Sequence, residues 1–150
     1  GMPMAWFDSM PDDDITAIAY LRKQLDTATD PLHRHFAFNE LERRLYKCRH
    51  AFASALTEFD HTCESHDAEM STIRPALVDA VGAVPFLPTY RQASIRHLNA
   101  KNLRAAARWT VLGIAAYADQ PVDPADLQDL DDRLARLQVD GRALADGEWR

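Results

Sequence analysis

Apolar residues recur every three or four positions along most of the chain, which predicts α-helices rather than strands. No segment alternates apolar and polar residues over the length of a strand. Acidic residues at 12–14 and the Asp30-Pro31 pair mark two helix starts, because carboxylates and an N1 proline suit a helix N-terminus. The Asp123-Pro124 pair marks a third start. The pattern therefore predicts an all-α fold of six or seven helices in antiparallel hairpins.

The longest helical stretch covers residues 32–74, which contain no glycine or proline. Its apolar stripe keeps one phase throughout, as a single long helix would. Globular helices average about 11–12 residues, and the cations Lys47, Arg49 and His50 are typical of a helix end. We therefore predict a break between His50 and Ser54, with Ser54 as the next cap. One unbroken helix is the alternative.

The helix before that break is apolar on two opposite faces. Such a helix packs between neighbours rather than on the outside, so we expect it at the centre of the fold. The two faces consist of Ala37, Phe38, Leu41, Leu45 and Cys48 on one side and of Leu32, Phe36 and Tyr46 on the other.

Downstream of residue 74, proline and glycine punctuate the chain. Pro75 predicts a restart with a short helix over 76–81, which Gly82 ends. Two further helices are expected over 88–100 and 103–117, joined by a brief turn.

A final amphipathic helix is expected over 123–140 and should fray at Gly141. Its leucines form a narrow seam, which packs back on its own domain or, as the alternative, forms a homodimer contact. The seam consists of Leu127, Leu130, Leu134 and Leu137.

The chain length of 150 residues fits one domain, which we place at 11–146. Residues 1–10 are aperiodic and are expected to be a flexible tail, in which Gly1 before Met2 is typical of a tag-cleavage scar. Residues 147–150 are expected to form a second tail.

Composition restricts the setting. No apolar run approaches the roughly 20 residues of a bilayer-spanning helix, and we expect no secretion signal. On either reading of the 32–74 stretch, Cys48 and Cys63 lie too far apart to form a disulfide. Reduced thiols are typical of the cytoplasm, so we expect a cytoplasmic protein without a membrane segment.

Aromatic and small residues are regularly spaced between Leu87 and Ala118. Tyr90 lies in the first helix, and small residues lie where the two helices would cross. In this spacing the segment resembles a tetratricopeptide-repeat unit, the two-helix module of peptide-binding solenoids. The resemblance implies a right-handed helical array, with an irregular bundle as the alternative. The small residues are Ala93, Ser94, Ala106 and Gly113, and the departures are Lys101 for glycine, Thr110 for an aromatic and Ala118 for proline.

Candidate chemistry centres on Cys63 and His66, which share a helix face at a spacing of three. Both lie on the apolar stripe, so the preferred interpretation is a buried thiol and a core histidine. A metal-binding or thiol enzyme centred on them is the alternative, and a metal would need further ligands such as His33 or His50. Phosphate-binding and dinucleotide-binding motifs are absent. We expect no catalytic residues, no metal and no cofactor.

Charge is distributed unevenly. Residues 80–118 hold five Lys and Arg and no acid, whereas residues 119–150 hold nine acidic and four basic residues, in a chain of net charge −6. This basic segment has two alternative sources of neutralising negative charge. One is the acidic final helix of the chain itself, and the other is an acidic peptide or protein partner. The positions matching the peptide-facing residues of tetratricopeptide repeats are Arg91, Ile95, Leu98 and Asn99, and Arg104 and Arg108 complete the candidate site.

Nucleic acid is a third interpretation of the basic hairpin. Tyr90 or Trp109 would then stack on bases among the arginines. The sequence pI of 5.4 disfavours long-range attraction to phosphates, so a nucleic-acid partner is not expected. The sequence as a whole predicts a non-catalytic scaffold or adaptor that binds a protein or an acidic peptide.

Overall fold

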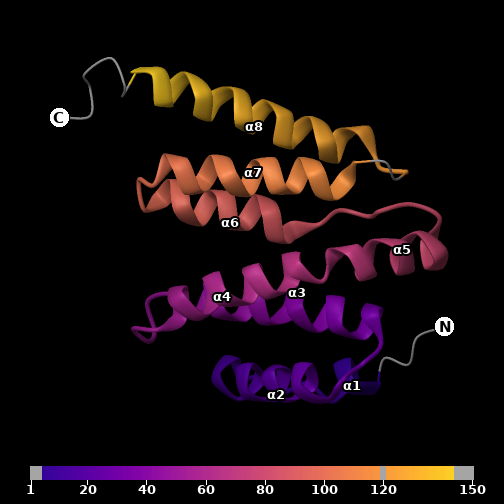
Figure 1. The fold of residues 1–150 in the computed structure, drawn as a ribbon. Coiled ribbons are helices and arrows are strands. Elements are labelled where there is room, and N and C mark those ends of the chain that lie inside the picture. The colour runs from indigo at the N-terminus through magenta and orange to yellow at the C-terminus, as the bar shows by residue number, and fades with distance from the viewer. Residues whose placement is uncertain (1–4, 119–120, 144–150) are drawn as a thin grey trace. The chain divides into compact units, whose positions relative to one another are not determined.

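The computed structural model describes the backbone of residues 5–118 and 121–143, and the side chains of residues 5–118 and 121–138. Eight helices form all the regular structure in these ranges, so the all-α prediction is confirmed (Figure 1). The helices form two compact units, Gly1–Ala76 and Leu77–Arg150. A single domain over 11–146 stays a prediction, and the expected tail at 147–150 lies outside the described residues.

Unit 1 contains α1 (Ala5–Asp8), α2 (Asp14–Thr27), α3 (Pro31–Lys47), α4 (Ala55–Ala68) and the first part of α5 (Met70–Val81). The predicted break in the long stretch is confirmed, because α3 ends before it and α4 begins after it. Within the unit α3 packs against both α2 and α4, which confirms its predicted central position. Its buried apolar residues are Ala37, Phe38, Leu41, Leu45 and the C-cap Cys48, and its buried polar residues are His35, Glu42 and Arg44.

Local capping chemistry starts the first two long helices where the sequence predicts them. The Asp13 carboxylate accepts a hydrogen bond from the Thr16 backbone N–H at 2.9 Å, and Asp30 accepts one from His33 at the same distance. Each bond satisfies a backbone N–H that has no partner within its helix. Ser54 occupies the N-cap position of α4, but its side chain makes no capping bond.

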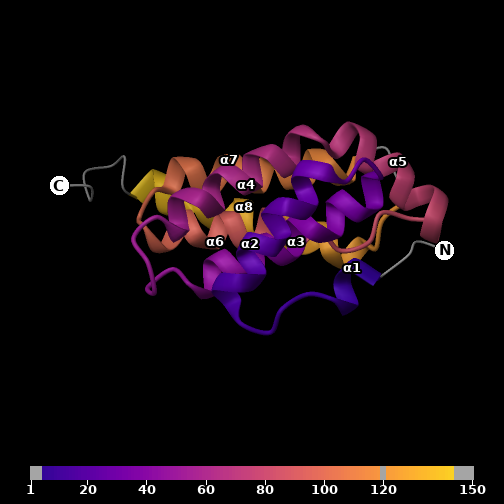
Figure 2. The same cartoon turned by 90° about the horizontal axis from the view of Figure 1, so that it is seen from below.

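The N-terminal segment is more ordered than expected. Instead of belonging to a flexible tail, Ala5–Asp8 form α1, and the Trp6 side chain is buried. Its indole stacks on the His33 ring at 4.7 Å, and the Tyr20 hydroxyl donates to the Trp6 carbonyl. The chain then returns to α2 by a loop on the outside of the unit (Figure 2). Aromatic contacts with later helices therefore hold a segment that has no periodicity of its own.

The break before α5 lies at Glu69 and not at Pro75, so the predicted restart is wrong. Pro75 lies inside α5, which begins at Met70. The Arg34 guanidinium donates to both carboxylate oxygens of Glu69, at 2.6 and 2.8 Å. A contact across 35 positions thus holds the residue between the two helices. The predicted end of α5 is confirmed, because Gly82 follows it with φ +83°.

Unit 2 contains the rest of α5, α6 (Pro88–Asn99), α7 (Leu103–Tyr117) and α8 (Pro124–Ala143). In this unit α7 packs against both α6 and α8. The backbone of α8 continues to Ala143, so the fraying expected at Gly141 is wrong. The turn between α6 and α7 has Lys101 at φ 59°, the left-handed conformation that glycine usually supplies.

Small residues let α6, α7 and α8 approach closely. A Cβ atom added at Gly113 would lie 2.7 Å from the Tyr90 Cβ and 2.8 Å from Leu130 Cδ1. The Ser94 and Thr110 hydroxyls meet at 2.9 Å in the same interior. The predicted close crossing of α6 and α7 is therefore confirmed.

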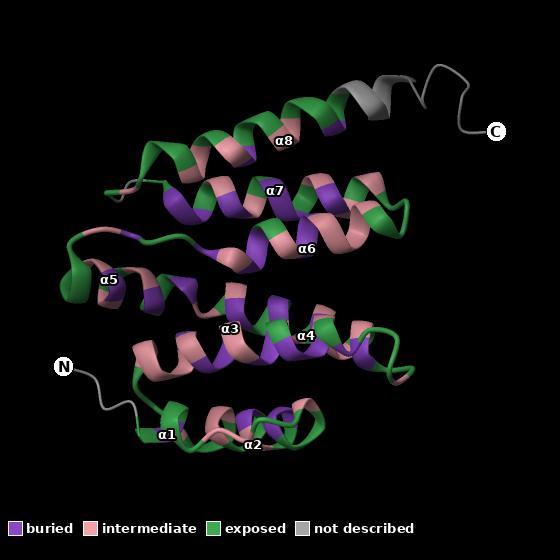
Figure 3. Cartoon of the chain, turned by 180° about the vertical axis from the view of Figure 1, so that it is seen from behind, coloured by how far each residue is buried: buried purple, intermediate pink, exposed green. Residues whose placement is uncertain are grey.

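Buried and half-buried positions recur along α8 between exposed ones (Figure 3). Leu130 and Leu137 are buried at 3% and 4% exposure, whereas Leu127 and Leu134 are half-buried. The seam therefore packs back on its own unit, and the homodimer contact stays an untested alternative.

Candidate functional site

The predicted peptide-facing residues of α6 lie along one side of the helix. Arg91, Ile95, Leu98 and Asn99 follow one another at spacings of four, three and one. Arg91 and Asn99 are exposed, while Ile95 and Leu98 are half-buried. This side of α6 thus combines a cation, an amide and two partly accessible apolar side chains.

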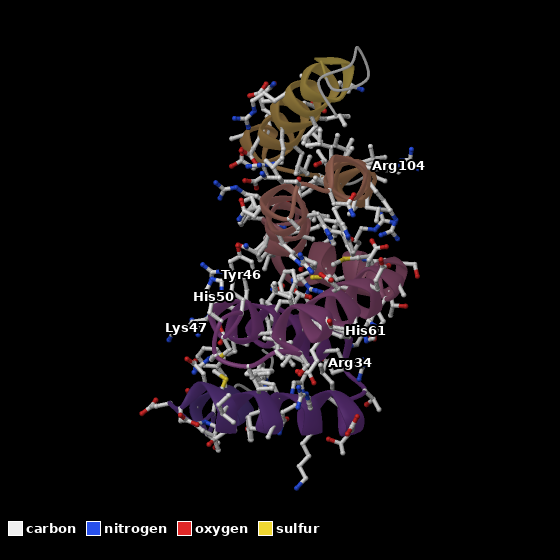
Figure 4. The ribbon with its side chains drawn as sticks, turned by 90° about the vertical axis from the view of Figure 1, so that its left-hand side faces the viewer. Arg34, Tyr46, Lys47, His50, His61 and Arg104 are labelled. Atoms are coloured by element: carbon white, nitrogen blue, oxygen red, sulfur yellow. The ribbon has the colours of Figure 1, made fainter. Side chains whose placement is uncertain are left out.

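The two arginines of α7 lie one helical turn apart and are both exposed. Arg108 places its guanidinium 5.2 Å from the centre of the Trp109 ring. Arg104 projects outward from its helix (Figure 4) and forms no ion pair with any described side chain. A solvated guanidinium that the fold does not use can pair bidentately with an external carboxylate.

Among the described side chains, Arg91 of α6 has one weak ion-pair contact with the acidic helix α8. Asp129 Oδ2 lies 3.7 Å from Arg91 Nε, and the two side chains are 39% and 50% exposed. Exposed pairs of this kind contribute about 0–1 kcal/mol. Within the described residues, α8 thus leaves Arg91 accessible to a second carboxylate.

Two further arginines lie near this pair. Asp129, Arg133 and Arg136 follow each other on α8 at spacings of four and three, which puts them on one face. The Arg133 Nε is buried and has no hydrogen-bond acceptor among the described residues. Burial lowers the pKa of Arg133, and the charges of Arg136 and Arg91 lower it further despite the opposing effect of Asp129. Sequence reasoning missed Arg133 and Arg136 because the helix is acidic overall. Their helical spacing from Asp129 was nevertheless visible in the sequence.

At the alternative centre of Cys63 and His66, the histidine belongs to a buried hydrogen-bond network inside unit 1. His66 Nδ1 donates to Glu42 at 2.8 Å, and His35 Nδ1 donates to His66 Nε2 at 2.8 Å. Asn39 Nδ2 lies 3.3 Å from His35 Nε2 and donates to it. Burial, and then the electrostatic effect of His66, lower the pKa of His35 to about 3, so this ring is neutral.

Burial also makes Cys63 a poor nucleophile. The residue is fully buried, and burial followed by the nearby Glu42 carboxylate raises the pKa of its thiol well above the usual range. Both ring nitrogens of His66 are already hydrogen-bonded. No three His, Cys, Asp or Glu side chains in the described ranges are placed to share a metal ion. The two residues thus meet the description of a core histidine and a buried thiol.

Unit 1 carries a cleft of about 450 Å³ that sequence reasoning did not predict. Residues of α2, α3 and α4 line it, and Arg34 and His61 lie on the same side of the unit, opposite Tyr46 (Figure 4). Arg34 is fully engaged, because it also donates to the backbone carbonyls of Leu25 and Ala28 at 2.6 and 2.9 Å. His61 is exposed at this cleft, and the other polar residues that line it include Asp26, Thr62 and Ser65.

Comparisons with protein-family models, with curated proteins and with solved structures found no match to this chain. The resemblance of Leu87–Ala118 to a tetratricopeptide-repeat unit therefore depends on its own residues alone. In the described part of the chain, no helix is both long and apolar enough to cross a bilayer.

Proposed function

We propose that this chain is a non-catalytic helical adaptor, which binds an acidic protein segment on the arginine-bearing surface of α6 and α7. The observation that carries this proposal is how little Arg91 and Arg104 are ion-paired with the described side chains. Arg91 has one exposed contact at 3.7 Å, and Arg104 forms no ion pair with the described side chains. A segment of residues 80–118 with five cations and no acid has charge complementarity to such a partner.

The enzyme alternative lacks an accessible nucleophile at its proposed centre. Cys63 and His66 each have 0% exposure, so a substrate cannot reach them without opening the core. A raised thiol pKa works in the same direction, because the thiolate is the reactive form. These observations favour the adaptor over a centre at this pair.

The test is a binding titration with a fluorescein-labelled hexaglutamate peptide, followed by anisotropy at low salt. Arg104→Glu should weaken binding by about tenfold, since one charge-assisted pair is replaced by repulsion. Lys23→Glu is the matched control, because it makes the same charge change at an exposed site of unit 1. Equal weakening by both variants, or no binding by the unaltered protein, would refute the proposal.

A further inference from the structure

The proposed surface contains one point where positive charge is concentrated beyond what the fold neutralises. Arg91 of α6 approaches the Asp129 carboxylate of α8, and Arg133 and Arg136 lie on the same face of α8 as Asp129. A second carboxylate, that of Asp126, lies near Asp129. Asp129 lies nearest to Arg91, at a separation of 3.7 Å that exceeds an ordinary hydrogen bond. Among the described side chains, this long Arg91–Asp129 contact is the one ion pair that Arg91, Arg133 and Arg136 form.

The Arg133 side chain supplies a second observation. Its Nε–H is shielded from solvent, yet no acceptor in the described residues receives it. A buried donor without an acceptor is costly, and the neighbouring guanidinium groups add repulsion. A carboxylate bound to the outer edge of the arginines would offset that repulsion and accept bidentate hydrogen bonds.

We infer that Arg91, Arg133 and Arg136 form a carboxylate anchor, in which an acidic side chain of the partner binds beside Asp129. This inference rests on the proposed function and extends its surface from α6 and α7 onto α8. Asp129 acts there as an internal competitor, because it places a carboxylate against the same guanidinium group that the partner requires. The fold thus holds the anchor in a weakly occupied state until a stronger carboxylate arrives.

The anchor predicts opposite effects for two variants of α8. Arg133→Gln should weaken binding of an amidated, fluorescein-labelled hexaglutamate by about tenfold, because it removes a charge-assisted contact. Asp129→Asn should tighten binding by about fivefold, because it removes a competing charge near the site. Asp131→Asn is the control, since it removes the same charge from an exposed position two residues along α8, which faces another direction.

A second probe distinguishes the source of the carboxylate. Hexaglutamine with a free C-terminus offers only a terminal carboxylate, whereas amidated hexaglutamate offers only side chains. If only the free-terminus probe responds to Arg133→Gln, the anchor for an acidic side chain is wrong and these arginines bind a terminal carboxylate instead. If both probes respond, the anchor accepts either carboxylate.

The outcomes separate the anchor from the proposed function. If Arg104→Glu weakens binding while Arg133→Gln and Asp129→Asn leave it unchanged, the anchor is wrong and the adaptor surface remains. If Asp129→Asn and Asp131→Asn tighten binding equally, the effect is general charge and the anchor is also wrong. If neither probe binds the unaltered protein, both proposals fail.

Discussion

The two units differ in how much their charged side chains contribute to the packing of the fold. In unit 1 the cations and carboxylates build the fold: Arg34 ties three helical segments together, and the His66–Glu42 pair lies in the core. In unit 2 packing is carried by aromatic and small residues such as Tyr90 and Gly113, while Arg104 projects outward. Charge that the fold uses is fixed in place, whereas charge that it does not use is available to a partner. This difference is why we assign binding to unit 2.

The strongest way to break the comparison is to remove the polar core of unit 1. His66→Ala should lower the free energy of unfolding by about 3–5 kcal/mol, because it strips a buried partner from Glu42 and leaves a cavity beneath Phe38. Urea denaturation measures the change. His61→Ala, at an exposed position on the same helix, should stay within about 0.5 kcal/mol. Similar losses for the two variants would show that the network does not stabilise the unit.

The packing of unit 2 is the next target. Gly113→Leu should cost on the order of 1–3 kcal/mol, because even a Cβ at this position lies within 3 Å of Tyr90 and Leu130. Val111→Leu, half-exposed on the same helix, should be nearly neutral. Thermal melting of both variants tests this prediction. A Gly113→Leu protein as stable as the unaltered one would contradict the close crossing of α6 and α7.

The stability of unit 1 at low pH should depend on His35, which lies in α3 of that unit. Its pKa is about 3 in the folded protein and about 6.5 when unfolded. Below pH 6.5 the unfolded chain therefore binds a proton that the folded chain excludes, so stability is complete above that pH and falls as pH drops toward 3. The slope should approach about 1.4 kcal/mol per pH unit at most.

Urea denaturation between pH 7.5 and pH 5 gives this slope directly. His35→Gln lacks the titrating ring, so its stability should depend less on pH across the same range. Parallel curves for the two proteins would mean that His35 does not contribute.

Local signals in the sequence predicted where helices begin, and distant contacts decided the rest. The Asp30-Pro31 start needs only residues within one helical turn, so the sequence suffices to find it. The break at Glu69 depends on Arg34, and the order of α1 depends on Trp6 meeting His33. Neither pairing produces a periodic pattern in the amino-acid sequence.

The candidate site was predictable to the same extent. Arg91 and Arg104 were evident from an acid-free segment of the sequence. Arg133 and Arg136 were hidden in an acidic helix, because the approach of Arg91 to Asp129 on the same face of that helix follows only from the packing of unit 2. The left-handed Lys101 likewise shows that a turn can form without the glycine that the repeat pattern supplies.

The smallest predicted effect tests the central claim most directly. The double variant Arg91→Glu/Arg104→Glu reverses two charges that the fold is held not to need, and its melting temperature is the measurement. We predict a midpoint within about 2 °C of the unaltered protein, the size expected for weak surface pairs. A fall of many degrees would mean that these arginines hold the chain's own acidic helix, which would leave no surface for a partner.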